Sequence, residues 1–255
     1  MMESLELVLL LFGLLLIAAL YASVGHGGAS GYLALLSLST LATMDPVWLK
    51  QHAWSLNLVV AAIAFWHYQR EGFHLPRLTI PFVVASIPLA LLGGYLSVGG
   101  SIYDLLLSLT LLWAAWRLWG GPSADSAADV VTPEAKAAAP VGGAIGLVSG
   151  LIGVGGGIFL TPVLLLKRWA TPKQAAATSA LFIWVNSLAG LAGSYTSEGM
   201  QLELELLIPF LAAVLLGGFI GSRYGSVVAP ESKVRRLLVL VLIVAATKRL
   251  FETFI

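Results

Sequence analysis

Two clusters of glycines are the residues of this chain best suited to bind a ligand through the backbone. The first is GHGG at 25–28 and the second is GVGGG at 153–157, and an apolar run that can start a helix follows each, near Ala29 and near Gly157. The first N–H groups of a helix have no internal partner and carry about half a positive charge. Because glycine lets a ligand approach the backbone closely, two such helix starts predict an anion site without basic side chains.

Polar side chains near the clusters are candidates to complete that site. His26 lies inside the first cluster, and it either contacts an anion or is a neutral histidine held by a backbone carbonyl. Asn57 and Asn186 lie near the middle of the apolar stretches that follow, and they either line a pathway or hold helices together by hydrogen bonds. For Thr178 and Ser179, packing is the favoured interpretation. The candidate binding residues are Gly25, His26, Gly27, Gly28, Ala29, Asn57, Gly153, Gly155, Gly156, Gly157, Thr178, Ser179 and Asn186.

The composition indicates that lipid surrounds most of the chain. Of the 255 residues, 58% are hydrophobic and 11% are charged, against about 45–50% and 25% in a soluble domain. So few charges cannot solvate a globule of this size, and we interpret the chain as an integral membrane protein. A net charge of +1 argues against a nucleic-acid partner. With no cysteine and no HExxH spacing, we expect neither a metal nor another cofactor.

Six apolar stretches are long enough to cross about 30 Å of hydrocarbon. They are 47–67, 78–98, 102–119, 174–196, 204–222 and 234–254. In 141–168, the run before the glycines and the run after them have about 11 residues each, too short to span at 1.5 Å per residue. Each glycine region is therefore either one broken crossing helix or a hairpin that enters and leaves on the same side, although residues 5–24 are long enough to span fully.

The two hydrophobic halves repeat the same motifs in the same order. Glu71-Gly72 recurs as Glu198-Gly199, Pro81-Phe82 recurs as Pro209-Phe210, and GGYLS at 93–97 recurs as GGFIGS at 217–222. We interpret residues 1–119 and 141–255 as two repeats. Residues 120–140 are rich in small residues and proline, bury little apolar surface, and are predicted to form a flexible cytoplasmic linker.

The distribution of basic residues favours hairpins. With hairpins, one side of the membrane holds 11 of the 14 Lys and Arg residues, whereas broken crossing helices divide them eight to six. A hairpin plus three spans gives each half an odd number of crossings, which inverts the second half and puts both termini outside. The predicted fold is therefore an all-α polytopic membrane protein of two inverted repeats, each a glycine-tipped hairpin or broken helix pair plus three transmembrane helices.

On these residues the chain resembles the sulfite exporter TauE/SafE family, also called the 4-toluene sulfonate uptake permease family. The resemblance rests on the glycine regions around 23–32 and 149–162, the Ala-Thr-Ser stretch at 177–179 and the duplicated layout. It implies transport of sulfur-containing anions, such as sulfite, sulfoacetate or other organosulfonates, across a bacterial inner membrane. The first half has GHGG where the second has GVGGG, so the two halves need not contact the anion equivalently.

We expect a secondary transporter that exports such anions and is not an enzyme. Its expected partners are a small anion and the lipid bilayer, and a homodimer is left open. The expected location is the bacterial inner membrane, with both termini in the periplasm. An anion channel on the same scaffold and a non-transporting accessory subunit remain as alternatives. An intramembrane enzyme is disfavoured because the apolar stretches contain no paired carboxylates and no Ser/His/Asp set.

Overall fold

Helices form all the regular structure in the part of the chain that the computed structural model describes. That part is 4–96 and 130–228, with the isolated helical residues 105, 106, 108–110, 112, 113, 116, 243 and 247. The first segment contains α1 (Ser4–Ala22), α2 (Ala29–Leu36), the 3-10 turn η1 (Thr40–Thr43), α3 (Pro46–Arg70) and α4 (Pro76–Tyr95). The second contains α6 (Ala135–Ile152), α7 (Gly157–Leu166), α8 (Pro172–Glu198) and α9 (Leu204–Val227). The predicted all-α class is confirmed for these residues.

The helices differ in length and in apolar character. α3 has 25 residues but is less apolar than the other long helices. Within the described residues, α1, α4, α6, α8 and α9 are long and apolar enough to cross a membrane. The short helices α2 and α7 have 8 and 10 residues, too few to cross hydrocarbon. Of the predicted spans at 102–119 and 234–254, the structure describes eight and two isolated helical residues, and the rest lie outside the described part.

The start of α6 corrects the expected boundary of the second half. α6 begins at Ala135, inside the predicted linker at 120–140, because the segment AKAAA consists of good helix formers. The helix therefore has 18 residues, close to the 19 of α1, and the run before the second glycine cluster is not too short to span. Each glycine region joins one long helix to one short helix. Residues 120–129 of the predicted linker lie outside the described part.

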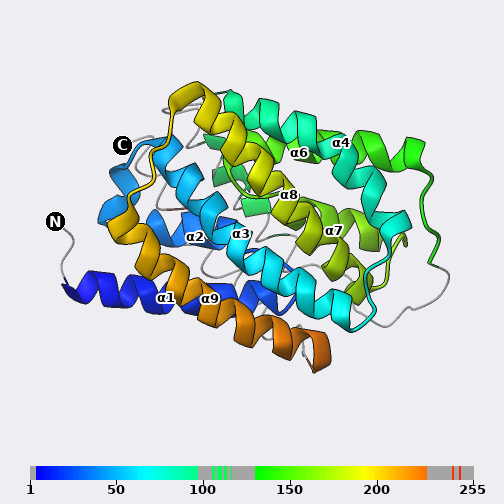
Figure 1. Ribbon diagram of the computed structural model, residues 1–255, viewed down its shortest axis with the longest axis horizontal. Helices are drawn as coiled ribbons and strands as arrows, with labels where there is room; N and C mark the ends of the chain where they lie inside the picture. Colours follow the sequence, from blue (N-terminus) through cyan, green and yellow to red (C-terminus); the bar gives the residue numbers. More distant parts are fainter. Residues whose placement is uncertain are drawn as a thin grey trace.

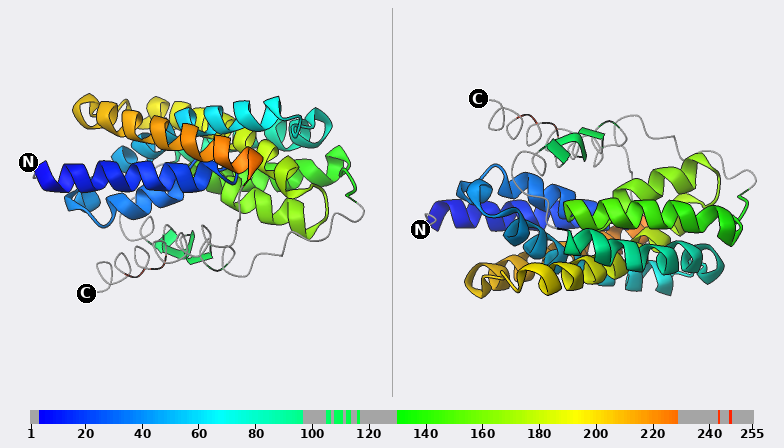
Figure 2. Two further views of the ribbon diagram at one scale, coloured as in Figure 1. Left: turned by 90° about the horizontal axis from the view of Figure 1, so that it is seen from below. Right: turned by 90° about the horizontal axis from the view of Figure 1, so that it is seen from above.

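The helices of the second segment follow the order of the first but run in the opposite direction (Figure 1). α1 and α6 start at opposite ends of the molecule, and their glycine turns lie in its interior (Figure 2). From these turns α2 and α7 run back toward the end from which the preceding long helix came. The two short helices consequently start near the middle and diverge from there.

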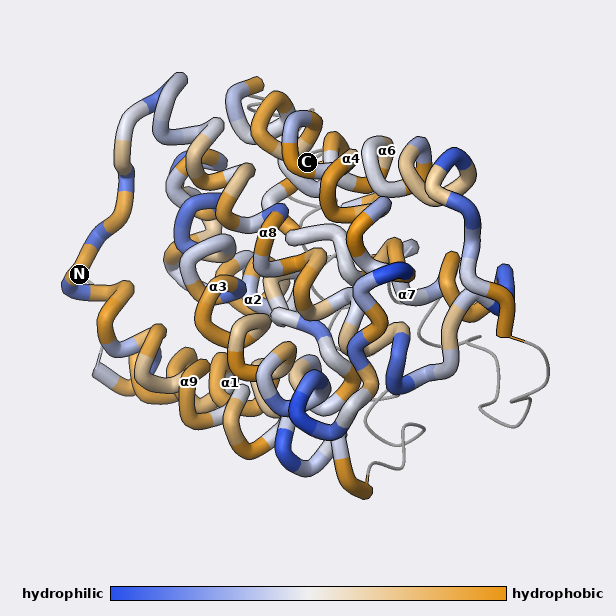
Figure 3. Tube along the Cα trace, turned by 45° about the vertical axis from the view of Figure 1, so that its right-hand side comes forward, coloured by the Kyte–Doolittle hydropathy of each residue, from blue (hydrophilic) through white to orange (hydrophobic). Residues whose placement is uncertain are grey.

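The surface and the interior have the polarity expected in lipid. Large apolar side chains are exposed along α1, α4 and α9, including Phe12, Val84 and Ile208. Figure 3 shows hydrophobic residues along most of these helices and hydrophilic residues gathered at helix ends and loops. The buried polar side chains lie mainly on α3 and α8, the two helices that pack together across the interior. The large apolar side chains exposed along these helices indicate a lipid-facing surface.

Glycines allow two pairs of long helices from different halves, α1 with α9 and α4 with α6, to pack closely. α9 presents a glycine at every fourth position to backbone carbonyls of α1, and the contacts join Gly217 to Leu15, Gly221 to Ala19 and Gly225 to Ser23. α6 packs on α4 in the same way, and there the contacts join Gly142 to Phe82, Gly146 to Ser86 and Gly150 to Ala90. Such small-residue stripes are the usual means of close helix packing in membranes.

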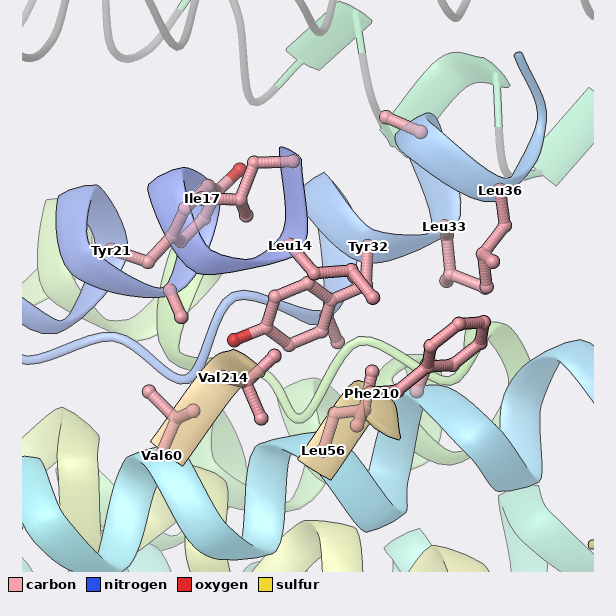
Figure 4. Packing of buried hydrophobic residues seen from close by; sticks show 14 of the residues in the cluster. Leu14, Ile17, Tyr21, Tyr32, Leu33, Leu36, Leu56, Val60, Phe210 and Val214 are labelled. Atoms are coloured by element: carbon pink, nitrogen blue, oxygen red, sulfur yellow. The ribbon is translucent and has the colours of Figure 1, made fainter. Parts of the chain in front are cut away.

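An apolar cluster fixes the first short helix between α1, α3 and α9. Tyr32 and Leu33 of α2 are fully buried against Leu14 of α1 and Val214 of α9 (Figure 4). The Tyr32 hydroxyl also donates a hydrogen bond of 2.7 Å to the Gly27 carbonyl, which satisfies one polar group of the turn. Packing and this bond together hold the start of α2 in the interior.

We expect Gly221→Ala to lower the free energy of unfolding by about 1–3 kcal/mol, the usual cost of overpacking. The added methyl group would meet the Ala19 backbone carbonyl, which cannot move away without separating α1 from α9. Thermal unfolding in detergent measures the effect. Gly218→Ala is the matched control, since there the nearest atoms, at 3.2 and 3.3 Å, belong to the Val60 side chain. Equal stability of the two variants would contradict the proposed packing.

Candidate anion-binding site

The two glycine turns meet in the interior of the protein. His26 of the first turn places its Nε2 3.2 Å from the carbonyl oxygen of Gly157, the first residue of α7. Gly27 and Gly155 lie against the same two side chains, Asn57 of α3 and Ile183 of α8. The glycine clusters at 25–28 and 153–157 therefore lie next to each other.

Glycine is required in these turns by backbone conformation. Five of the glycines have a positive φ, a region that side chains disfavour; they are Gly25, Gly28, Gly153, Gly155 and Gly156. Gly28 and Gly156 are the residues directly before α2 and α7, with φ values of 105° and 83°. The reversal after each long helix thus depends on left-handed residues that start the short helix.

Asn57 caps the first short helix. Its Oδ1 accepts a hydrogen bond of 3.0 Å from the N–H of Ala29, the first residue of α2. Its Nδ2 donates a bond of 3.2 Å to the Ser187 hydroxyl on α8. The amide oxygen therefore stands where an oxygen atom of a bound anion would accept from the same N–H group.

The second short helix lacks the corresponding cap. Asn57 lies 11 residues after Pro46, at the start of α3, and the residue 11 positions after Pro172, at the start of α8, is Ile183. Ile183 packs on Gly155 and Gly157 but offers no hydrogen-bond acceptor. Among the described residues, none accepts a hydrogen bond from the first two N–H groups of α7, those of Gly157 and Ile158. The N–H groups of Ser30 and Gly31 at the start of α2 also have no acceptor among the described residues, so both helix starts keep donors for a ligand, and only α2 has a side-chain acceptor at its first N–H.

His26 links the two turns through both ring nitrogens. Nδ1 lies 3.0 Å from the Val24 carbonyl, and Nε2 lies 3.1 Å from the Thr161 hydroxyl as well as near Gly157. A neutral ring can donate from Nδ1 and accept from Thr161, whereas a protonated ring can donate to both carbonyls. The Thr161 hydroxyl also forms a hydrogen bond of 2.8 Å with the Ser179 hydroxyl. Both protonation states of His26 therefore have partners in this geometry.

Two of the candidate polar residues point elsewhere. The Thr178 hydroxyl bonds that of Thr79 on α4 at 3.0 Å. Asn186 donates from Nδ2 to the Phe182 carbonyl of its own helix, and its buried Oδ1 has no partner among the described residues. Asn186 is three positions beyond Ile183, so it does not occupy the place on α8 that Asn57 occupies on α3.

The outer glycines of the clusters serve packing. Gly25 lies against the backbone of Ala176 on α8, and Gly153 lies against Lys50 on α3. Ala176 and Lys50 are each four residues after the first proline of their helix, at equivalent positions. Gly28 and Gly156 contact Tyr32 and Phe182. Close packing across the halves explains Gly25 and Gly153 without a ligand, and packing within one half explains Gly28 and Gly156.

Three residues at the turns were missed by the sequence analysis. Ile183 packs on Gly27, Gly155 and Gly157, and its apolar side chain gave no signal. Thr161 joins His26 to Ser179, and a polar residue one turn after Gly157 in an apolar helix was a usable signal. Lys50, which the sequence analysis did not consider as a candidate for the site, is only 1% exposed and packs on Gly153.

Two residues that follow Lys50 on α3 hold the loop between α8 and α9. Gln51 donates to the Gly199 carbonyl at 2.8 Å and accepts from the Gln201 N–H at 2.7 Å. The Glu203 N–H donates to His52 Nε2 at 3.3 Å. At the other end of the molecule, Lys173 of α8 lies 4.8 Å from the ring centre of Phe73, in the loop between α3 and α4. Each half therefore fastens a loop of the other.

Comparison with known proteins identifies the family of the chain. Residues 9–249 match the family described as sulfite exporter TauE/SafE. The chain belongs to this family. It is 37% identical over 239 residues to the probable membrane transporter protein y4hK of Sinorhizobium fredii (strain NBRC 101917 / NGR234), covering 92% of this chain and 94% of that protein. No solved structure matches.

A second relative is more distant. The probable membrane transporter protein YunE of Bacillus subtilis (strain 168) is 24% identical over 182 residues, which is 64% of either chain. The family and the apolar helices together make this TauE/SafE chain a multi-pass membrane protein of a transporter family, and not an enzyme.

We expect Asn57→Ala to destabilise the protein more than Asn186→Ala. Both changes remove the same number of atoms from a fully buried site, so their cavity costs are similar. Only Asn57→Ala also removes a helix cap, which costs about 1 kcal/mol. The difference in thermal unfolding of the purified proteins measures that cost. If Asn186→Ala proves equally or more damaging, Asn57 is not the cap of α2.

Proposed function

We propose that this TauE/SafE protein exports small sulfur-containing anions, such as sulfite, sulfoacetate or other organosulfonates, across a bacterial inner membrane. The observation that carries the proposal is the meeting of the two glycine turns where α2 and α7 begin. Two helix starts at one interior position create a positive potential without a fixed charge. An anion bound by such dipoles can be released more easily than one held by an arginine.

The anion is proposed to bind at the start of α7. The N–H groups of Gly157 and Ile158 supply donors, because no described residue accepts from them. The hydroxyl of Ser187 and the ring of His26 lie beside the same turn. At α2, the anion would replace Asn57 as acceptor of the Ala29 N–H. Gly27, Gly155 and Gly157 remain the proposed inner lining, whereas Thr178, Asn186 and the other four cluster glycines are assigned to packing.

Alternating access is the proposed mode of transport. The side chains of Asn57 and Ile183 lie directly against the turns, so an anion can reach the turns only after these side chains move away. Opposite directions of the two sets of helices support two inverted repeats, an arrangement in which one half rocks against the other. A permanently open channel would leave the turns uncovered, and their close packing favours a transporter.

The proposed orientation puts both termini in the periplasm. The basic residues Arg70, Arg77 and Arg223 lie at the end of the molecule where α1 ends, and the positive-inside rule makes that end cytoplasmic. Because the membrane potential is negative inside the cell, each negative charge that leaves the cell releases about 2.3 kcal/mol per 100 mV. Export therefore needs no coupling ion, whereas import of the same anion would.

We expect Gly27→Val to abolish efflux while the protein still inserts and folds. The added side chain would occupy the position of the Asn57 amide and Ile183, at the point where the anion must pass. Gly13→Ala is the control, since its methyl group meets only the flexible end of Leu35. Efflux of labelled sulfite and of sulfoacetate from proteoliposomes gives the readout. Normal flux through folded Gly27→Val would exclude the proposed site.

Counterflow distinguishes a transporter from a channel. Unlabelled sulfoacetate inside the liposomes is expected to accelerate uptake of labelled sulfoacetate from outside, because an alternating site returns faster when loaded. A channel gives no such acceleration. If the purified protein moves neither sulfite nor a sulfonate, the accessory-subunit alternative stands instead.

A further inference from the structure

A groove between α3 and α9 carries charges that the proposed transport does not use. It has a volume of 460 Å³ and is lined by Trp66, His67, Arg70, Glu71, Phe219, Arg223, Ser226 and Val227. A second hollow of 490 Å³ adjoins it along α9 and shares Phe219, Arg223 and Val227 with it. Both lie where the two helices approach their C-terminal ends, on the exterior of the bundle.

Two arginines from different halves of the chain face this groove. Arg70 ends α3, and Arg223 lies in the last turn but one of α9. The Arg70 guanidinium lies 5.5 Å from the centre of the Trp66 ring, so the aromatic face helps to hold it. Neither arginine is ion-paired with a carboxylate of the described residues, where Lys136–Glu134 forms the sole salt bridge. Glu71 offsets one of the two positive charges, and the groove remains net cationic.

Contacts between α3 and α9 shape the groove, and its wall on α9 is largely apolar. The His67 ring packs edge-on against Phe219 at 5.2 Å, and its Nδ1 lies 2.9 Å from the Ser222 hydroxyl. Phe219 and Ile220 are 45% and 60% exposed and precede Arg223 on α9, so they lie between that arginine and the middle of the helix. An apolar strip therefore runs from the arginines toward the middle of the bundle.

We propose that this groove binds an anionic phospholipid of the bilayer, with its phosphate between Arg70 and Arg223 and an acyl chain along Phe219 and Ile220. Arginine recognises phosphate through two parallel N–H donors. An aromatic residue such as Trp66 is favoured at headgroup depth. The charge pattern and the apolar wall together match a lipid rather than a soluble ion, because a free phosphate makes no use of the exposed strip. This inference does not depend on the transported substrate.

Lipid binding to the purified full-length protein tests the proposal. In native mass spectrometry, phosphatidylglycerol is expected to bind at least tenfold more tightly than phosphatidylcholine. It should also raise the melting temperature in detergent, which inorganic phosphate at the same concentration should not do. In Arg70→Gln/Arg223→Gln the preference for phosphatidylglycerol should fall at least tenfold. Arg77→Gln is the matched control, since Arg77 is an exposed arginine at the same end, on α4, and does not line the groove.

A further variant guards against misfolding of the double mutant. Val227→Glu puts a carboxylate at the mouth of the groove at a largely exposed position, so it should weaken phosphatidylglycerol binding without disturbing the fold. Three results would overturn the proposal. They are unchanged lipid preference in both groove variants, an equal loss in Arg77→Gln, or equal stabilisation by inorganic phosphate, which would indicate a soluble anion as the ligand.

Discussion

The constraint on which this structure depends is that backbone polar groups cannot be left without partners in hydrocarbon. The chain breaks two helices in its interior, at 23–28 and 153–156, and must therefore surround both breaks with protein. The partners come from the opposite half or from neighbouring helices. Asn57 caps Ala29, Tyr32 donates to Gly27, and Tyr68 of α3 donates to the Ser23 carbonyl. Each helix start still keeps two N–H groups without a partner among the described residues, Ser30 and Gly31 at α2 and Gly157 and Ile158 at α7, and these are the donors that the proposed anion would use.

Interleaving of the two halves follows from the same requirement. α1 and α4 of the first half pack on α9 and α6 of the second half through glycines that meet backbone carbonyls. Gly221 meets the Ala19 carbonyl in this way, and Gly146 meets that of Ser86. At the two ends of the molecule, Gln51 and Lys173 contact loops of the opposite half. Each half therefore supplies part of the other's packing. Under the proposed alternating access, the contacts at one end would loosen while those at the other end hold.

The sequence predicted the outline of the fold because its strongest signals act over short distances. Apolar length located the helices at 78–98, 174–196 and 204–222. The glycine clusters located both interior turns, since left-handed backbone at positions such as Gly28 and Gly156 admits little else. The sequence did not reveal which residues of α3 and α8 lie against the glycine turns. Asn57 and Asn186 looked alike in the sequence, yet a shift of three residues on α8 puts Ile183 at the turn and turns Asn186 away. Ala135–Pro140 was taken as linker because composition does not reveal what a helix will pack against.

The central claim is that the interior turns carry a positive potential that selects anions. The chain contains no cysteine, so a single cysteine at Ser187 reports on the turn alone, with exposed Ser197 as reference. The decisive measurement compares the rates at which an anionic and a cationic methanethiosulfonate reagent of similar size modify each cysteine in membranes. Relative to the reference, Ser187→Cys should react preferentially with the anionic reagent, and sulfoacetate should slow that reaction. Preference for the cationic reagent, with no protection by sulfoacetate, would contradict the account.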